Sequence, residues 1–220
     1  DITSTTGGLL VPRMTAAQRD AITATQGLII FCSDCASGEG ELQIKLTSSW
    51  INLHNGGDVN DPSLFAIGDT HQGGIIFYLD GSGGGLVAAP SDQSTAAEWG
   101  CFGQSISGTG SAVGTGAANT TAIVISCSES AIAAKICADL TLGGYTDWFL
   151  PSKDELNLMF DNIGQGNALG LGNVGNFNNN SYWSSTEFVN YYAWFQNFYY
   201  GNQDAFEKYY TFGVRAVRAF

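Results

Sequence analysis

The chain has 220 residues, of which 44% are hydrophobic and 13% are charged, and its formal net charge is −12. A chain of this length forms one large domain, or one domain with a smaller appendage, and can bury a substantial core. Its eight Lys and Arg are not clustered, since none lies between Lys45 and Lys135 or between Lys153 and Lys208. Nucleic acids and anionic membranes bind clustered cations, so the charge pattern argues against both as partners.

The low charged fraction also indicates where the protein works. It is about half of the ~25% that soluble domains carry, which leaves Gly, Ser, Thr and Asn to hydrate the surface, as in secreted, fibre-like and adhesive proteins. No apolar run approaches the ~20 residues of a membrane span, so we expect no membrane insertion. Asp1 to Ser4 resemble no signal peptide. We therefore expect either that an export signal has already been removed or that the protein uses another export route. A virion protein would need no export signal.

Residues 1–66 are predicted to form a small β-rich segment. Thr15 to Gln18 fit a capping box that starts a helix. The polar, turn-rich stretch from His54 to Pro62 is typical of a linker. Strands are expected at 27–31, 42–46 and 50–53.

The C-x-x-C motif of Cys32 and Cys35 lies in this segment. It suits a redox pair, half of a zinc site, a local disulfide or two free thiols. Zinc would need two further ligands, and His54 is the only nearby candidate. We therefore favour a disulfide or free thiols, and we expect no metal and no cofactor.

The pattern changes after the linker, and residues 67–220 are predicted to form the main domain. A hairpin is expected at 75–79 and 86–89. The stretch 103–121 is rich in Gly, Ser, Thr and Ala, lacks the Lys and Ser/Thr ending of a phosphate-binding loop, and is expected to be a long surface loop. Further strands are expected at 182–186, 193–198 and 214–220.

Two helices are expected between the hairpin and the later strands. Apolar residues at every fourth position from Ile132 to Leu140 predict the first. Ser152 and Glu155 form a capping box for the second, which Gly164 ends. The predicted fold class is therefore α+β, with two helices and mixed or antiparallel strands, preceded by the β-rich N-terminal segment.

Candidate catalytic residues are few. The only histidines are His54 and His71, and no GxSxG motif is present. A nucleophilic Cys–His pair is possible, for example Cys101 with His71. No pair of carboxylates is singled out for glycoside hydrolysis. Cys127 and Cys137 flank a helix-like stretch, and either is a partner for Cys101. Because the cysteine count is odd, at least one thiol stays unpaired in a monomer. The chain is predicted not to be an enzyme.

The outstanding feature is the segment 188–212, where 12 of 25 residues are Phe, Tyr or Trp. Strand alternation places only every second side chain inward, so we expect one member of each doubled tyrosine to face solvent. Exposed aromatic patches mark binding sites, and Tyr supplies contact area at low entropic cost. Trp183, Trp194 and Phe198 are instead assigned to the core.

Three motifs carry a resemblance to a known family. They are GGYTDWFLPSKDEL at 143–156, YWSSTE at 182–187 and VRAVR at 214–218. Over roughly residues 68–220 the chain resembles a bacterial and phage family with a C-type-lectin-like fold. Within that family it looks like the variable protein of a diversity-generating retroelement, with a variable region at about 182–220.

The resemblance implies that certain side chains vary, because such retroelements rewrite template adenines, mostly in Asn codons. The family's fold implies that these side chains gather on one solvent-facing surface. Ala193, Trp194, Phe198, Gly201 and Lys208 are expected to be scaffold. The expected ligand-binding residues have side chains that such codons encode: Phe188, Val189, Asn190, Tyr191, Tyr192, Phe195, Tyr199, Tyr200, Asn202, Asp204, Ala205, Phe206, Tyr209, Tyr210 and Phe212.

The resemblance implies no chemistry. The related formylglycine-generating enzymes use a pair of C-terminal cysteines that this chain lacks, and the calcium-binding motifs of true C-type lectins are absent. Residues 6–15 are similar to segments of phage tail fibres, which suggests that residues 1–66 serve attachment or oligomerisation, such as a homotrimer.

The sequence thus predicts an adhesin or a phage tail receptor-binding protein. It would lie on a virion surface, on a bacterial cell surface or be secreted, and bind a protein or glycan receptor on a cell. An enzyme of the same scaffold that acts on surface glycans, and a structural fibre or pilus subunit, are the alternatives.

Overall fold

The computed structural model describes residues 11–23, 27–33, 35, 40–45, 50–52 and 65–220. The predicted linker at 54–62, His54 and the first residues of the segment 6–15 lie outside this part of the chain. The chain divides into two compact units, residues 1–64 and 65–220. Helices and several sheets occur together, which confirms the α+β class.

The N-terminal unit contains one small sheet and one short helix. Thr15 and Gln18 form the predicted capping box at the start of the helix α1 (Ala16–Asp20). The strands follow the order β1-β2-β3-β4, and only β1 and β2 are parallel. Their bounds are β1 Arg13–Met14, β2 Ile29–Cys32, β3 Glu41–Lys45 and β4 Trp50–Asn52.

The described core of this unit is small and contains a buried polar contact. It consists of Ile30, Cys32 and Trp50. Arg19 is buried, and its guanidinium donates a 3.1 Å hydrogen bond to Gln43 Oε1. Cys32 and Cys35 form a disulfide, so the C-x-x-C motif is a local disulfide rather than a zinc ligand pair.

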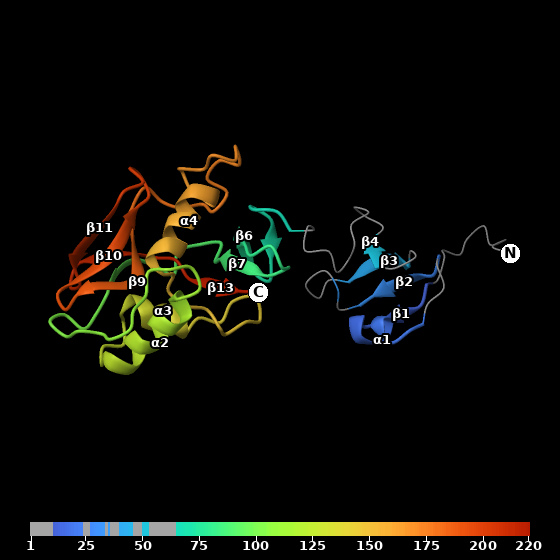
Figure 1. Ribbon diagram of the computed structural model, residues 1–220, viewed down its shortest axis with the longest axis horizontal. Helices are drawn as coiled ribbons and strands as arrows, with labels where there is room; N and C mark the ends of the chain where they lie inside the picture. Colours follow the sequence, from blue (N-terminus) through green and yellow to red (C-terminus); the bar gives the residue numbers. More distant parts are fainter. Residues whose placement is uncertain (1–10, 24–26, 34, 36–39, 46–49, 53–64) are drawn as a thin grey trace. The chain divides into compact units, whose positions relative to one another are not determined.

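The second unit is built from two sheets and three helices (Figure 1). One sheet has the strand order β11-β10-β9-β12-β8. Its strands are β8 (Ser94–Glu98), β9 (Ser181–Val189), β10 (Tyr192–Asn197), β11 (Gln203–Glu207) and β12 (Thr211–Val214). β5 (Thr70–His71), β6 (Gly74–Leu79), β7 (Gly85–Ala88) and β13 (Val217–Ala219) form the other, in the order β13-β7-β6-β5. The helices are α2 (Gly116–Ser126), α3 (Ala133–Ala138) and α4 (Lys153–Ile163).

The prediction of two helices in this unit was wrong, because part of the stretch assigned to a loop is helical. Residues 116–121 belong to α2, whose Gly, Asn and Thr residues are weak helix formers. Tertiary hydrogen bonds stabilise it: Thr120 Oγ1 accepts from Leu150 N at 3.0 Å, and Asn119 Nδ2 donates to Gly110 O at 2.7 Å. The predicted helix from Ile132 to Leu140 is shorter than expected, since α3 covers only Ala133–Ala138.

The helix α4 agrees closely with its prediction. Ser152 and Glu155 form both hydrogen bonds of the capping box. Glu155 is fully buried, and its two carboxylate oxygens accept from Gly114 N and Ser152 N, each at 2.7 Å. Desolvation raises the pKa of Glu155 against the opposing effect of these hydrogen bonds.

The expected strand at 214–220 is two strands in different sheets. β12 ends at Val214 and β13 begins at Val217, so Arg215 and Ala216 lie between the sheets. The cause is the Arg215 side chain, which turns inward and is buried. A continuous strand in a single sheet would separate this guanidinium from its partners.

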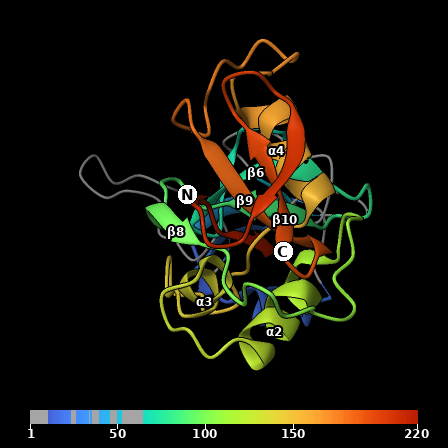
Figure 2. The same ribbon diagram turned by 90° about the vertical axis from the view of Figure 1, so that its left-hand side faces the viewer.

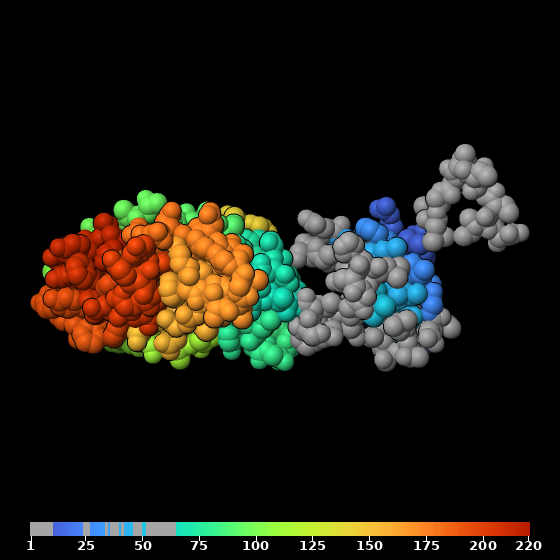
Figure 3. All heavy atoms as spheres, turned by 90° about the horizontal axis from the view of Figure 1, so that it is seen from above, coloured from blue at the N-terminus to red at the C-terminus, as the bar shows by residue number. Residues whose placement is uncertain are grey.

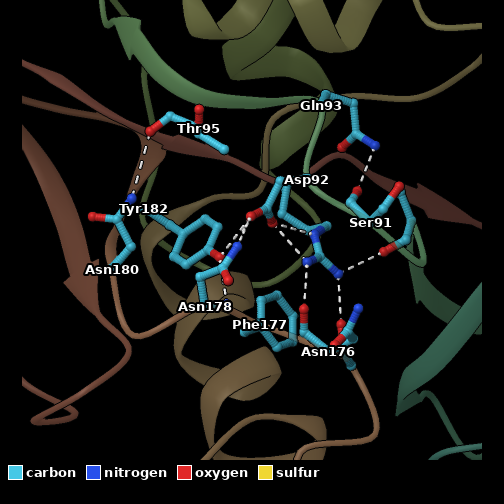
Figure 4. Close-up of polar contacts among 12 residues, drawn as sticks. Ser91, Asp92, Gln93, Thr95, Asn176, Phe177, Asn178, Asn180 and Tyr182 are labelled. Atoms are coloured by element: carbon cyan, nitrogen blue, oxygen red, sulfur yellow. Dashed lines mark hydrogen bonds and ion pairs between the residues drawn. The ribbon is translucent and has the colours of Figure 1, made fainter.

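Those partners form a network around Asp92 (Figure 4). Arg215 Nη2 donates to Asp92 Oδ1 at 2.6 Å, and Tyr182 Oη donates to Asp92 Oδ2 at 3.0 Å. The guanidinium also donates to Gly175 O at 2.6 Å and lies 4.3 Å from the centre of the Phe177 ring. Burial, and secondly the charge of Asp92, raise the pKa of Tyr182 to about 12. The network joins β9, the loop before it and the crossing between the two sheets.

Asp92→Ala should destabilise the chain strongly, because it leaves the buried Arg215 charge unpaired. We expect a loss of about 3–5 kcal/mol in the free energy of unfolding, measured by urea titration. Asp161→Ala, which removes an exposed carboxylate from α4, is the matched control and should change stability by about 0.5 kcal/mol or less. Equal effects of the two substitutions would contradict a stabilising role for the network.

Glu155→Gln should change the pH dependence of stability. The folded-state pKa of Glu155 is raised above its ordinary value of 4.5, so the native fold disfavours the ionised form. The contribution of this group to stability is therefore greatest below pH 4.5 and falls as the pH rises through the interval between the two pKa values. The difference in unfolding free energy between wild type and Glu155→Gln should show this fall; a difference independent of pH would refute it.

Candidate binding surface

The aromatic segment forms β10, β11 and the ends of β9 and β12. Figure 1 shows β9, β10 and β11 at one end of the second unit, with β6, β7 and β13 at the other. Figure 2 looks onto β9 and β10 from that end. In the antiparallel pairing, Phe195 lies opposite Asp204 in β11 and opposite Trp183 in β9. Paired residues share a face of the sheet, so the side chains of the segment divide between two faces.

None of the fifteen expected binding residues is buried. Nine are exposed: Phe188, Val189, Tyr191, Tyr199, Tyr200, Asn202, Asp204, Tyr209 and Tyr210. Six are half-buried: Asn190, Tyr192, Phe195, Ala205, Phe206 and Phe212. In Figure 3 the red and dark orange atoms of this segment form the surface of one end of the second unit.

The residues expected to be scaffold are more buried. Ala193, Phe198 and Lys208 are fully buried, whereas Gly201 is half-buried. Trp183 and Phe198 are core residues as predicted. The assignment of Trp194 to the core was wrong, because its ring is half-buried and lies under Lys153 Nζ at 4.1 Å.

Of the three doubled tyrosines, only Tyr191 and Tyr192 divide into an exposed and a half-buried side chain. Tyr199 and Tyr200 are both exposed, at 60% and 77%, since they occupy the turn between β10 and β11. Asn197 Oδ1 accepts from both of their backbone N–H groups at 2.9 Å. Phe198, between Asn197 and Tyr199, is buried against aromatic rings of the core. The turn is therefore held from inside while two adjacent rings face outward.

A second set of rings, exposed except for half-buried Phe206, gathers at the opposite end of β10. Phe102 lies 5.1 Å from Tyr191 and 4.9 Å from Tyr209, measured between ring centres. Tyr209 in turn lies 5.0 Å from Tyr210, which lies 4.6 Å from Phe206. We call these five residues the Phe102 cluster. Half of the Phe102 side chain is exposed, and sequence reasoning missed it because it lies outside the aromatic segment.

The structure thus does not gather all the expected residues into one patch. The Tyr199–Tyr200 turn and the Phe102 cluster are separated by the length of β10, which is about 20 Å at ~3.3 Å per residue. Between the turn and the cluster lie half-buried Phe195 and Phe212, whose ring centres are 4.9 Å apart. Both rings pack on Trp183. Phe188 contacts Trp194, which alternation places on the opposite face from Phe195.

The loop that carries Phe102 is fixed at several points. Cys101 forms a disulfide with Cys127, so Cys137 is the free cysteine, and burial raises the pKa of its thiol. Gly103 N donates to Asn190 O at 3.0 Å, which ties the loop to the β9–β10 connection. Gly100 has a φ of +94°, and a Cβ there would approach Ile132 to 2.5 Å, so glycine is required.

Beneath the Phe102 cluster lies a buried ion pair. Lys208 Nζ donates to Glu187 Oε1 at 2.5 Å and to Gln104 O at 2.9 Å, and it lies 4.5 Å from the centre of the Trp99 ring. Glu187 also accepts from Ile106 N at 3.0 Å. Desolvation lowers the pKa of Lys208, while the hydrogen bond to Glu187 acts in the opposite direction. The pair joins β9 and the segment before Tyr209 to the loop 104–106.

The catalytic and metal-binding hypotheses find no support among the described residues. Cys101 is in a disulfide, and His71 packs between the rings of Phe65 and Phe220, so His71 and Cys101 do not form a catalytic pair. The one described group of three potential metal ligands consists of Cys101, Cys127 and Glu129, of which the first two are disulfide-bonded. No helix in the described part of the chain is long and apolar enough to cross a membrane.

Exposed rings on an anchored turn and on a loop fixed by a buried ion pair are typical of ligand-binding proteins. Residues 91–218 match the Lcl C-terminal domain, and the chain belongs to this family. Residues 1–82 match a phage tail like trimerisation region. No curated protein matches the chain. The two family matches support a phage-type ligand-binding protein.

Lys208→Met should loosen the loop that carries the Phe102 cluster, because Glu187 is then buried without a counterion. We expect a loss of about 3–5 kcal/mol in unfolding free energy and faster hydrogen exchange at Ile106 N. Lys153→Met, which removes a half-buried lysine that forms no ion pair among the described residues, is the control. Unchanged exchange at Ile106 in Lys208→Met would show that the pair does not hold the loop.

Proposed function

We propose that this protein is a receptor-binding protein, of a phage tail fibre or of a bacterial surface, that recognises a receptor on a cell through its exposed aromatic residues. The single observation that carries the proposal is the Tyr199–Tyr200 turn, where two adjacent exposed rings stand on a turn anchored by buried Phe198 and by Asn197. Folding alone does not require two exposed tyrosines at this position. A preorganised pair of rings loses little conformational entropy on binding.

The proposed binding residues are the fifteen expected from the sequence together with Phe102, and they form more than one patch. Each well-buried ring contributes on the order of 1–3 kcal/mol to binding. Exposed Asn202 and Asp204 supply polar contacts beside the rings. A protein or a glycan receptor offers the apolar faces and polar groups that such a surface needs.

We further propose that the surface is diversified by a retroelement. None of the fifteen residues is buried and nine are exposed, which supports this because substitutions at exposed positions change the ligand-binding surface while leaving the core intact. Their buried neighbours Ala193, Phe198 and Lys208 are side chains on which the fold depends.

The match of residues 1–82 to a phage tail like trimerisation region supports a homotrimer formed through the N-terminal segment. Three copies of the binding surface on one fibre would raise the overall affinity through avidity, without any new contact. Placement on a virion surface agrees with this arrangement.

The double substitution Tyr199→Ala/Tyr200→Ala should weaken adsorption of the whole chain to host cells at least about tenfold, since two exposed rings are lost. The thermal unfolding midpoint should be unchanged, because neither ring is buried. Ile125→Ala on α2, 80% exposed and outside the aromatic segment, is the control and should adsorb normally. Normal adsorption of the tyrosine variant would contradict the proposed surface.

Sequencing of the 3′ end of the gene in its source population tests the diversification. We expect substitutions to concentrate in the codons of the fifteen residues, each aligned with an adenine in a nearby near-copy of the gene. A uniform sequence without such a copy would leave a fixed receptor-binding protein.

A further inference from the structure

A pocket of about 510 Å³ is lined by residues that lie next to the Phe102 cluster in the sequence or by a hydrogen bond, although no cluster residue lines the pocket itself. Glu98, Glu129 and Thr211 line it together with the apolar residues Ala97 and Ile132. Thr211 directly follows Tyr210 of the cluster. Glu129 accepts a 2.9 Å hydrogen bond from Cys101 N, the residue before Phe102. Two lining residues of the pocket are therefore linked through the backbone to the cluster residues Tyr210 and Phe102.

The two carboxylates of the pocket have no cation of the protein as partner. Among the described residues, neither Glu98 nor Glu129 forms an ion pair. Residues 65–220, all described, carry thirteen Asp and Glu against five Lys and Arg, and none of the five lines the pocket. Lys208 and Arg215 are buried in ion pairs of their own. Both carboxylates are exposed, so a positively charged ligand can reach them and complements their charge.

Aromatic faces next to carboxylates suit one ligand chemistry in particular. Lys and Arg carry a cation on an apolar stem, so the stem contacts apolar walls while the charge reaches carboxylates. Exposed tyrosine and phenylalanine rings also attract cations through their π faces. Glycans that carry sulfates or uronic acids would instead be repelled by the same carboxylates.

We propose that the pocket and the Phe102 cluster form one subsite for a protein ligand, which takes an Arg or Lys side chain in the pocket and a neighbouring aromatic side chain against Phe102 and Tyr209. This inference rests on the proposed receptor-binding function and names the class of its ligand as a basic protein segment. Phe102 is then a ligand-contacting residue outside the aromatic segment, held in place by the Cys101–Cys127 disulfide.

The subsite is tested with two dipeptides, N-acetyl-Tyr-Arg-amide and N-acetyl-Tyr-citrulline-amide, which differ in charge but hardly in shape. Binding of each to the whole chain is measured by calorimetry. The arginine dipeptide should bind at least about tenfold tighter, and this preference should shrink at high salt, because salt screens partly exposed charges. Equal affinities, or no binding of either dipeptide, would overturn the inference.

Variants assign the binding to these residues. Glu98→Gln/Glu129→Gln should abolish the preference for arginine, and the amide introduced by Glu129→Gln retains an oxygen that accepts from the Cys101 N–H. Glu98→Gln alone leaves that hydrogen bond untouched and should reduce the preference for the arginine dipeptide. This single variant replaces the double variant in the test if the double variant misfolds. Phe102→Ala should weaken both dipeptides equally. Asp161→Asn, which removes a carboxylate from α4, should leave both affinities unchanged. Retained arginine preference in Glu98→Gln/Glu129→Gln would also overturn the inference.

Adsorption to host cells, measured in parallel, separates this inference from the proposed function. If the wild-type chain adsorbs to host cells but binds both dipeptides equally, the cation subsite is rejected and the receptor-binding function is retained. Absence of adsorption by the wild-type chain rejects receptor binding itself.

Discussion

The ion pair between Lys208 and Glu187 is the constraint on which the Phe102 cluster of the candidate binding surface depends. Both side chains are removed from water, and a buried ion is tolerated only when its partner and further hydrogen bonds compensate for the lost hydration. Glu187 also accepts from Ile106 N, and Lys208 also donates to Gln104 O. These contacts therefore bring together the loop 104–106, β9 and the segment before Tyr209. The rings of the Phe102 cluster are positioned by these same segments.

A comparable division of roles runs through the whole aromatic segment. The side chains that point inward, such as Ala193 and Phe198, fill the core, while their neighbours in sequence face outward. Backbone hydrogen bonds of the sheet do not depend on the outward side chains. The turn at 197–201 follows the same logic, because Asn197 and Phe198 fix it without using Tyr199 or Tyr200. The chemistry of the surface is thereby separated from the stability of the fold.

The parts of the fold that sequence reasoning predicted well carry local signals. These signals are the capping boxes at Thr15 and Ser152 and the apolar spacing along α4. They act within one or two helical turns, so they can be recognised without knowing the fold. The helix α2 lacks such signals, since its stability comes from hydrogen bonds to residues about 10 to 30 positions away, such as that of Thr120 with Leu150. The break between β12 and β13 has the same kind of cause, because Arg215 turns inward toward Asp92, which is 123 positions distant.

For the candidate site, the sequence by itself determined that part of the aromatic segment faces solvent, because adjacent aromatic residues cannot all point inward from a strand. It also determined that cations are scarce and that the cysteine count is odd. Only the tertiary structure decided that Phe102 joins Tyr191 and Tyr209, that Cys101 pairs with Cys127, and that Glu98 and Glu129 line one pocket. The physical reason is that these contacts join residues far apart in the chain, and no local propensity or spacing specifies which distant segments the buried charges and the core bring together.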